Sequence, residues 1–159
     1  SASRVGTDGR VSGAALDTAL DPAWQPWVHV LELALAEADD PAWMHMVPAP
    51  VERPAGAPLL HDTTLRLDDS RVRAHVRRLA AAVGLTGADA LDGAGAVRAA
   101  IARDDATIAR IAERAGVPVD TATVVAQLAA LPLLHACARA LAAHVPPSWQ
   151  RGWCPVCGA

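Results

Sequence analysis

Two cysteines near the C-terminal end of the sequence are its clearest candidates for chemistry. The run Cys154-Pro155-Val156-Cys157-Gly158 places two thiols across a tight turn. Its proline fixes φ, and its glycine permits a left-handed backbone beside the second sulfur. Paired thiolates of this kind bind zinc or iron, but a tetrahedral site needs four ligands, usually from two such turns. The sequence contains one turn, so Cys154 and Cys157 are predicted to supply half of a metal site.

A second group of candidates would form a surface for a protein partner. The proline-rich segment 41–60 is predicted to be an irregular loop, and long loops in compact domains are often functional. An arginine-rich segment follows at 66–78 and could hold an acidic partner. The candidate partner-binding residues from these two segments are Trp43, Met44, His45, Met46, Arg73 and Arg77. Two simpler interpretations stay open, because the first four could merely cover the helices and the arginines could form a solvated helix face.

The sequence gives little support for catalysis. It contains no P-loop, no dinucleotide-binding glycine motif and no zinc-protease helix motif. Cys137 lies at core spacing and is predicted to behave as a small buried hydrophobic residue. A thiol–disulfide oxidoreductase would place its cysteine pair at a helix start after a strand, and no strand is predicted before Cys154. We therefore expect a protein that is not an enzyme.

The elements that must position these residues are predicted to be helices. The chain is 52% hydrophobic, much of this is alanine, and it has no Phe or Tyr. This composition is typical of closely packed helices. The prediction is an all-α protein, a compact bundle of about five to six helices over residues 21–146. A flexible arm (1–20) precedes it, and the start of an incomplete rubredoxin-like or zinc-ribbon module (147–159) follows.

Individual helices are predicted from caps and periodicity. Asp21-Pro22 begins a helix that runs to about Ala38, and Asp68 to Ser70 cap a second helix that runs to Val83. A helical pair follows, from 96 to 103 and from Asp104 or Asp105 to 115. The most apolar helix, from about 120 to 144, is predicted to be the central core helix. In the first helix the stripe expected to face the core is Trp24, Trp27, Val28, Leu31 and Leu35.

Residues 108–128 imitate a helix-turn-helix, with Gly116 in the turn. A DNA-binding regulator is therefore the alternative function. The proposed recognition helix has no Arg or Lys between Arg114 and Arg139, so it could scarcely bind phosphates. The net charge of -3 and the pI near 6.0 also give no general attraction to nucleic acid. We therefore expect no nucleic-acid partner.

Cysteine usage and hydropathy bear on where the protein resides. Three cysteines, two of them in one turn, do not resemble the disulfide framework of a small secreted domain. Polar residues and prolines interrupt the apolar runs before they reach the roughly 20 residues of a membrane span. A cytoplasmic protein with no membrane span is predicted.

The segment Ala130 to Ala159 resembles the formate dehydrogenase accessory proteins of the FdhE type. The residues that carry the resemblance are Trp149, the pair Gly152-Trp153 and the turn Cys154 to Gly158, after an apolar helix. The resemblance implies a cytoplasmic accessory or maturation protein that contacts the catalytic subunit of formate dehydrogenase. It also implies that Cys154 and Cys157 are metal ligands, for zinc or iron, in a rubredoxin-like module with further cysteine pairs.

The sequence departs from that family because no later cysteine pair follows Cys157. Two hypotheses explain the missing cysteine pair. In the first, which we prefer, the chain is the N-terminal part of a longer protein. In the second, a homodimer completes the site with four sulfurs. A helical fragment without independent activity is the remaining alternative.

Overall fold

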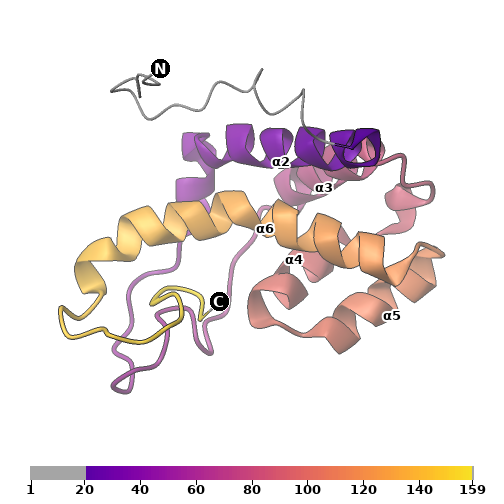
Figure 1. Cartoon of the computed structure of the whole chain (residues 1–159). Coiled ribbons are helices and arrows are strands. Elements are labelled where there is room, and N and C mark those ends of the chain that lie inside the picture. The colour runs from indigo at the N-terminus through magenta and orange to yellow at the C-terminus, as the bar shows by residue number, and fades with distance from the viewer. Residues whose placement is uncertain (1–20, 159) are drawn as a thin grey trace, which may run out of the picture.

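The fold of residues 21–158, which the computed structural model describes, is built around its most apolar helix, α6 (Val119–Leu141). Four shorter helices pack against it: α2 (Gln25–Ala38), α3 (Asp69–Ala82), α4 (Gly93–Ala102) and α5 (Asp105–Ala115). Figure 1 shows α6 crossing the molecule between α2 and the pair α4 and α5. The prediction that this helix is the central core helix is confirmed.

The all-α prediction is also confirmed, because the described residues contain five α-helices and no strand. Short 3-10 helices add to them: η1 (Pro22–Trp24), η2 (Pro41–Met46), η3 (Ala88–Ala90) and η4 (Ala142–His144). The segment 41–60, predicted to be irregular, thus begins with a 3-10 helix and is irregular after it. The predicted arm 1–20 lies outside the described residues.

Aspartates begin three of the helices by accepting from otherwise unpaired amides. The carboxylate of Asp68 accepts from the N–H groups of Ser70 and Arg71, as predicted. Asp92 accepts from Gly95 before α4, and Asp104 accepts from Thr107 before α5. Each such cap typically stabilises a helix by about 1 kcal/mol. Local sequence therefore sets these helix starts.

Small side chains decide how closely α6 approaches its neighbours. Its fully buried positions include Ala126, Ala129 and Ala136 beside larger Val125 and Leu133. Alanine leaves room for a neighbouring helix to come near, so α6 can pack closely against its neighbours. The absence of Phe and Tyr from the sequence agrees with this packing.

The predicted core-facing stripe of α2 is wrong. Trp24, Leu31 and Leu35 are 59%, 41% and 54% exposed, and Trp27 and Val28 are only partly buried. The buried face consists of Val30, Ala34 and Ala38. These smaller residues allow α2 to pack closely on α6 and α3. Because both faces are apolar, the periodicity of this helix does not reveal which face is buried.

Residues Val119–His144 form a helix that is long and apolar enough to cross a membrane. Half of the most apolar 18-residue stretch of this helix is buried inside the fold. A buried core helix passes this test of length and composition as readily as a membrane span does, so the finding does not distinguish them.

Candidate metal site

The two candidate metal ligands lie in a closed turn. The N–H of Gly158 donates to the carbonyl oxygen of Cys154 at 2.9 Å, which brings the ends of the turn together. Gly158 has a φ of +78°, the left-handed conformation that the sequence motif led us to expect. We call residues 154–158 the cysteine turn.

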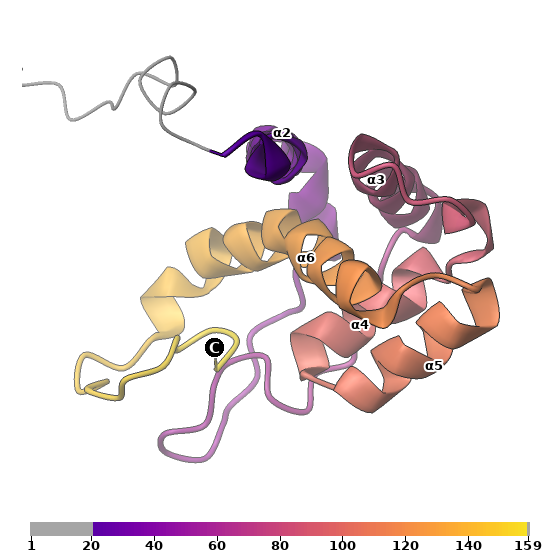
Figure 2. The same ribbon diagram turned by 45° about the vertical axis from the view of Figure 1, so that its right-hand side comes forward.

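Main-chain hydrogen bonds attach the cysteine turn to the helical domain. The N–H of Leu59 donates to the carbonyl of Pro155, and the N–H of Leu60 donates to that of Val156, both at 2.9 Å. Val156 is 4% exposed and belongs to the hydrophobic core. Figure 2 shows the C-terminal segment beside the loop that leads from η2 to α3, as Figure 1 does. The turn is therefore packed against the domain.

The surroundings of Cys154 favour its thiolate. Partial burial raises the pKa of this thiol, but the backbone N–H groups of Cys157 and Val156, the Cys157 thiol and the Gly158 N–H donate to its sulfur. These donors outweigh the burial, so the pKa of Cys154 lies below its usual value. The thiolate is the form that binds zinc and iron, so the turn suits a metal ligand.

Cys137 of α6 lies beneath the turn but has different chemistry. It is fully buried, as the sequence predicted. Burial, and to a lesser degree the charge on Cys157, raise the pKa of the Cys137 thiol to about 11. The Cys137 thiol is therefore neutral at physiological pH, which makes it a weaker ligand than a thiolate. The influence of Cys157 nevertheless shows that all three sulfurs belong to one region of the molecule.

The donor set fits half of a zinc or iron site. The turn holds two cysteine sulfurs, and backbone amides donate to that of Cys154. Cysteine sulfur is a ligand type that these metals prefer. Within residues 21–158, however, no three side chains of His, Cys, Asp or Glu stand ready to hold one ion. Completion of the site thus requires either movement or ligands from elsewhere.

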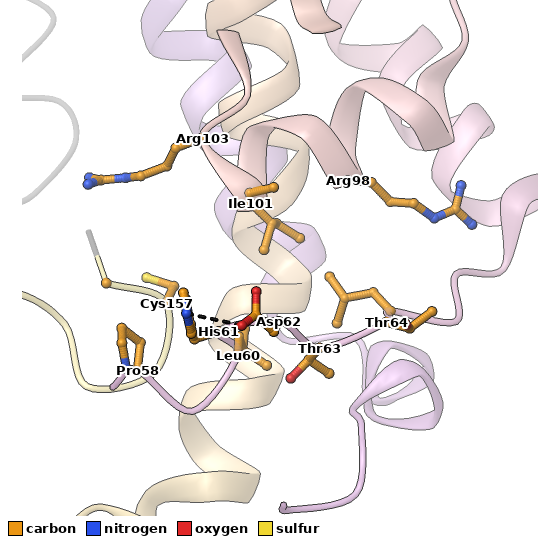
Figure 3. Close-up of a pocket in the computed structure, with 13 residues that line it drawn as sticks. Pro58, Leu60, His61, Asp62, Thr63, Thr64, Arg98, Ile101, Arg103 and Cys157 are labelled. Carbon is orange, nitrogen blue, oxygen red and sulfur yellow. Dashed lines mark ion pairs between the residues drawn. The ribbon is translucent and has the colours of Figure 1, made fainter. Parts of the chain in front are cut away.

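A pocket of about 550 Å³ opens beside the cysteine turn. It lies between the turn, residues 58–65 and the C-terminal end of α4. Its polar lining, drawn in Figure 3, includes His61, Asp62, Arg98, Arg103 and Cys157. His61 Nε2 lies 3.2 Å from Asp62 Oδ2, so the ring and the carboxylate form a pair. His61 could not be recognised from the sequence, because no local spacing connects it with the cysteines.

Two of the four candidate partner-binding residues in η2 are not at the surface. Trp43 is fully buried and Met46 is 6% exposed. The indole N–H of Trp43 donates to Glu37 Oε1 at 3.2 Å. Met44 and His45 remain exposed. The simpler interpretation, in which these side chains cover the helices, therefore applies to Trp43 and Met46.

The two candidate arginines of α3, Arg73 and Arg77, are exposed. Acidic side chains pair with most of the arginines in this part of α3. Arg77 Nε lies 3.0 Å from Asp89 Oδ1, and Arg73 is exposed. Arg71 contacts Glu37 Oε1 at 3.2 Å and Asp40 Oδ2 at 2.8 Å. Arg78 also pairs with Glu37. This segment therefore presents less positive charge than its sequence suggests.

The helix-turn-helix pattern forms a helical hairpin in which Gly116 ends α5 with a φ of +66°. Its second helix is α6, which packs against all four of the other α-helices. The exposed positions near its N-terminal end, Val119, Asp120, Val124 and Gln127, carry no positive charge. No feature of this hairpin favours DNA binding.

Gly158→Ala is expected to weaken the attachment of the cysteine turn. An added Cβ would come within 2.9 Å of Pro58 Cγ, and the left-handed backbone would itself be strained. We expect a loss of about 1–2 kcal/mol in the free energy of unfolding, measured by urea denaturation. Gly116→Ala measures the backbone strain alone, because Gly116 has a φ of +66° but an added Cβ would meet no atom within 4 Å. Gly152→Ala, which meets no atom within 4 Å, should change stability by less than about 0.5 kcal/mol. Equal stability of the Gly158 and Gly152 variants would contradict the packing described.

The site thus consists of the attached cysteine turn, the pocket beside it and the buried Cys137 beneath it. Its function has to be argued from these residues. Comparisons with protein-family models, with curated proteins and with solved structures found no match.

Proposed function

We propose that this protein is an accessory factor for the maturation of formate dehydrogenase. It acts by binding the catalytic subunit, it is not an enzyme, and it works in the cytoplasm. The observation that supports this most is the attachment of the cysteine turn to the helical domain by two main-chain hydrogen bonds and the buried Val156. The motif that carries the resemblance to the FdhE type is therefore an integral part of the fold.

The metal belongs to the same proposal. The thiolate-favouring surroundings of Cys154 suit zinc or iron in a rubredoxin-like site, with Cys154 and Cys157 as two of its ligands. When bound, such a metal would fix the cysteine turn and hence the loop attached to it. Cys154→Ser is expected to abolish metal binding.

A binding role also needs an accessible surface, and α2 supplies one. Trp24, Leu31 and Leu35 form an exposed apolar stripe along its outer side. Large apolar residues at helical spacing are the anchors by which a helix binds in a groove of another protein. The face carries one nearby charged pair, His29 Nδ1 and Glu32 Oε2 at 3.8 Å, which would lie at its rim. We place the catalytic subunit on this stripe.

The double substitution Leu31→Asp and Leu35→Asp should reduce capture of the catalytic subunit. Placing two carboxylates in a desolvated apolar contact should weaken binding by at least about tenfold. The measurement is the affinity of the full chain for a purified formate dehydrogenase catalytic subunit. Both residues are exposed, so the urea midpoint should hardly change.

Val124→Asp is the matched control, because Val124 is an exposed apolar residue on a different helix. It should leave capture unchanged. Equal capture by all three proteins would show that the α2 stripe is not the contact surface. No capture by the unmodified chain would contradict the proposed function itself.

A further inference from the structure

We infer that His61 is the third protein ligand of the metal held by Cys154 and Cys157, so that the ion is bound by two thiolates and one imidazole. This inference rests on the metal site of the proposed function. The fourth position would face the pocket. One chain would then supply three of the ligands, and none of the three would come from a second cysteine turn.

The main chain brings His61 to the cysteine turn. Leu59 and Leu60 donate to the carbonyls of Pro155 and Val156, and His61 is the next residue. Pro58 lies beside Gly158, since a Cβ added at Gly158 would come within 2.9 Å of Pro58 Cγ. The loop thus runs along the turn, and His61 and Cys157 line the same pocket (Figure 3). Residues distant in sequence are held together by backbone contacts.

The Asp62 carboxylate contacts one ring nitrogen of His61 and leaves the other for a metal ion. The 3.2 Å contact joins Nε2 of the ring to Asp62 Oδ2, so Nδ1 remains for a metal. Metal-ligating histidines usually donate their second ring N–H to a carboxylate in this manner, which fixes the tautomer and raises basicity. Asp62 has a φ of +51°, which is uncommon outside glycine. Such conformations persist at binding sites more often than elsewhere.

Binding requires the His61 side chain to move, and its exposure permits this. No three ligating groups in residues 21–158 are placed around one point as they stand. The side chain of His61 is 58% exposed, so its ring can turn without opening the core. The free energy of binding a structural zinc ion far exceeds the cost of ordering one side chain.

Cys137 is the competing candidate for a third ligand, and its position argues against it. It is fully buried in the core, with 0% of its surface accessible to solvent. Its sulfur would have to leave the packing of α6 to reach an ion, whereas His61 already lies at the pocket. A Cys137→Ser variant tests this alternative directly.

The experiment is a Co²⁺ titration of the full chain, reduced and without a metal-binding tag, followed by absorption spectroscopy and native mass spectrometry. The expected result is one Co²⁺ per chain, with sulfur-to-cobalt charge transfer and the intense visible bands of a tetrahedral ion. His61→Ala should weaken binding by at least about 100-fold and shift the visible bands. Asp62→Asn, which removes only the orienting carboxylate charge, should weaken it by about 10- to 100-fold.

His29→Ala is the matched control, because His29 is also exposed and paired with a carboxylate, but lies on α2. It should bind Co²⁺ as the unmodified chain does. Circular dichroism checks that each variant is folded.

Three results would overturn the inference. One Co²⁺ per two chains, with no effect of His61→Ala, would indicate a four-sulfur site shared by a homodimer. One Co²⁺ per chain that depends on Cys137 and not on His61 would assign the third ligand to Cys137. Absence of Co²⁺ binding would show that Cys154, Cys157 and His61 do not form a metal site in this chain. Capture of the catalytic subunit is measured separately, so the adaptor role can survive any of these results.

Discussion

Replacing Trp43 by alanine should lower the free energy of unfolding by about 3–5 kcal/mol, the usual cost of truncating a buried aromatic residue. Trp43 is fully buried, and its ring meets the His75 ring edge-on with centroids 5.7 Å apart. Its N–H also satisfies Glu37 at 3.2 Å. The variant therefore creates a cavity and removes a hydrogen bond to a carboxylate at once. Urea denaturation at pH 7.5 measures the loss.

Trp24→Ala is the matched control, because it removes the same side chain from an exposed position. Its effect on unfolding should be about 0.5 kcal/mol or less. Trp24→Ala should weaken capture of the catalytic subunit more than Trp43→Ala does, since Trp24 belongs to the α2 stripe. A stable Trp43→Ala variant with impaired capture would instead support a partner-binding role for Trp43.

The starts of α3 and α5 and the end of α5 could be predicted because their causes are local. The start of α4, predicted at 96, lies at Gly93, after the cap Asp92. Asp68 and Asp104 each accept from amides two or three residues ahead, and Gly116 takes a left-handed conformation directly after α5. Such signals need no knowledge of the rest of the fold. The cysteine turn could be predicted for the same reason, as its hydrogen bond closes within five residues.

The choice of buried faces could not be predicted as well. In α2 Leu31 and Leu35 are exposed, whereas Val30, Ala34 and Ala38 are buried, because close approach to α6 favours small side chains. The burial of Trp43 likewise depends on α3, which supplies His75 beneath it. Both results arise from packing between helices that are far apart in sequence.

The pocket could not be predicted because main-chain bonds assemble it. Leu59 and Leu60 donate through their backbone amides to the cysteine turn, and backbone groups leave no signature in residue type. His61 acquires its position from that pairing. A sequence pattern identifies residues that act through their own side chains, whereas the register of two paired loops has to be observed.

Lowering the pH from 7.5 to 5 should cost the protein about 2 kcal/mol of stability through His75 alone. This residue is 1% exposed, and burial lowers its pKa from 6.5 to about 4; the Glu37 carboxylate opposes the shift, and Arg78 and Arg71 add to it. Below pH 6.5 the unfolded chain takes up a proton on His75, while the folded chain does not until about pH 4. Stability therefore falls with pH across this window.

His75→Leu should remove most of that loss, because leucine has a similar size and does not titrate. Among residues 21–158 the ring Nε2 has no hydrogen-bond partner, and Nδ1 lies 3.2 Å from Arg78, so few polar contacts are lost. The measurement is the free energy of unfolding in urea at pH 7.5 and pH 5 for both proteins. The carboxyl groups of Glu37, Asp40, Asp68 and Asp104 have lowered pKa values, so their contributions are lost mainly below this window. An equal loss of unfolding free energy in the two proteins would show that His75 is protonated in the folded state at pH 5. Glu37 would then stabilise the charged, buried ring more strongly than the packing around Trp43 suggests.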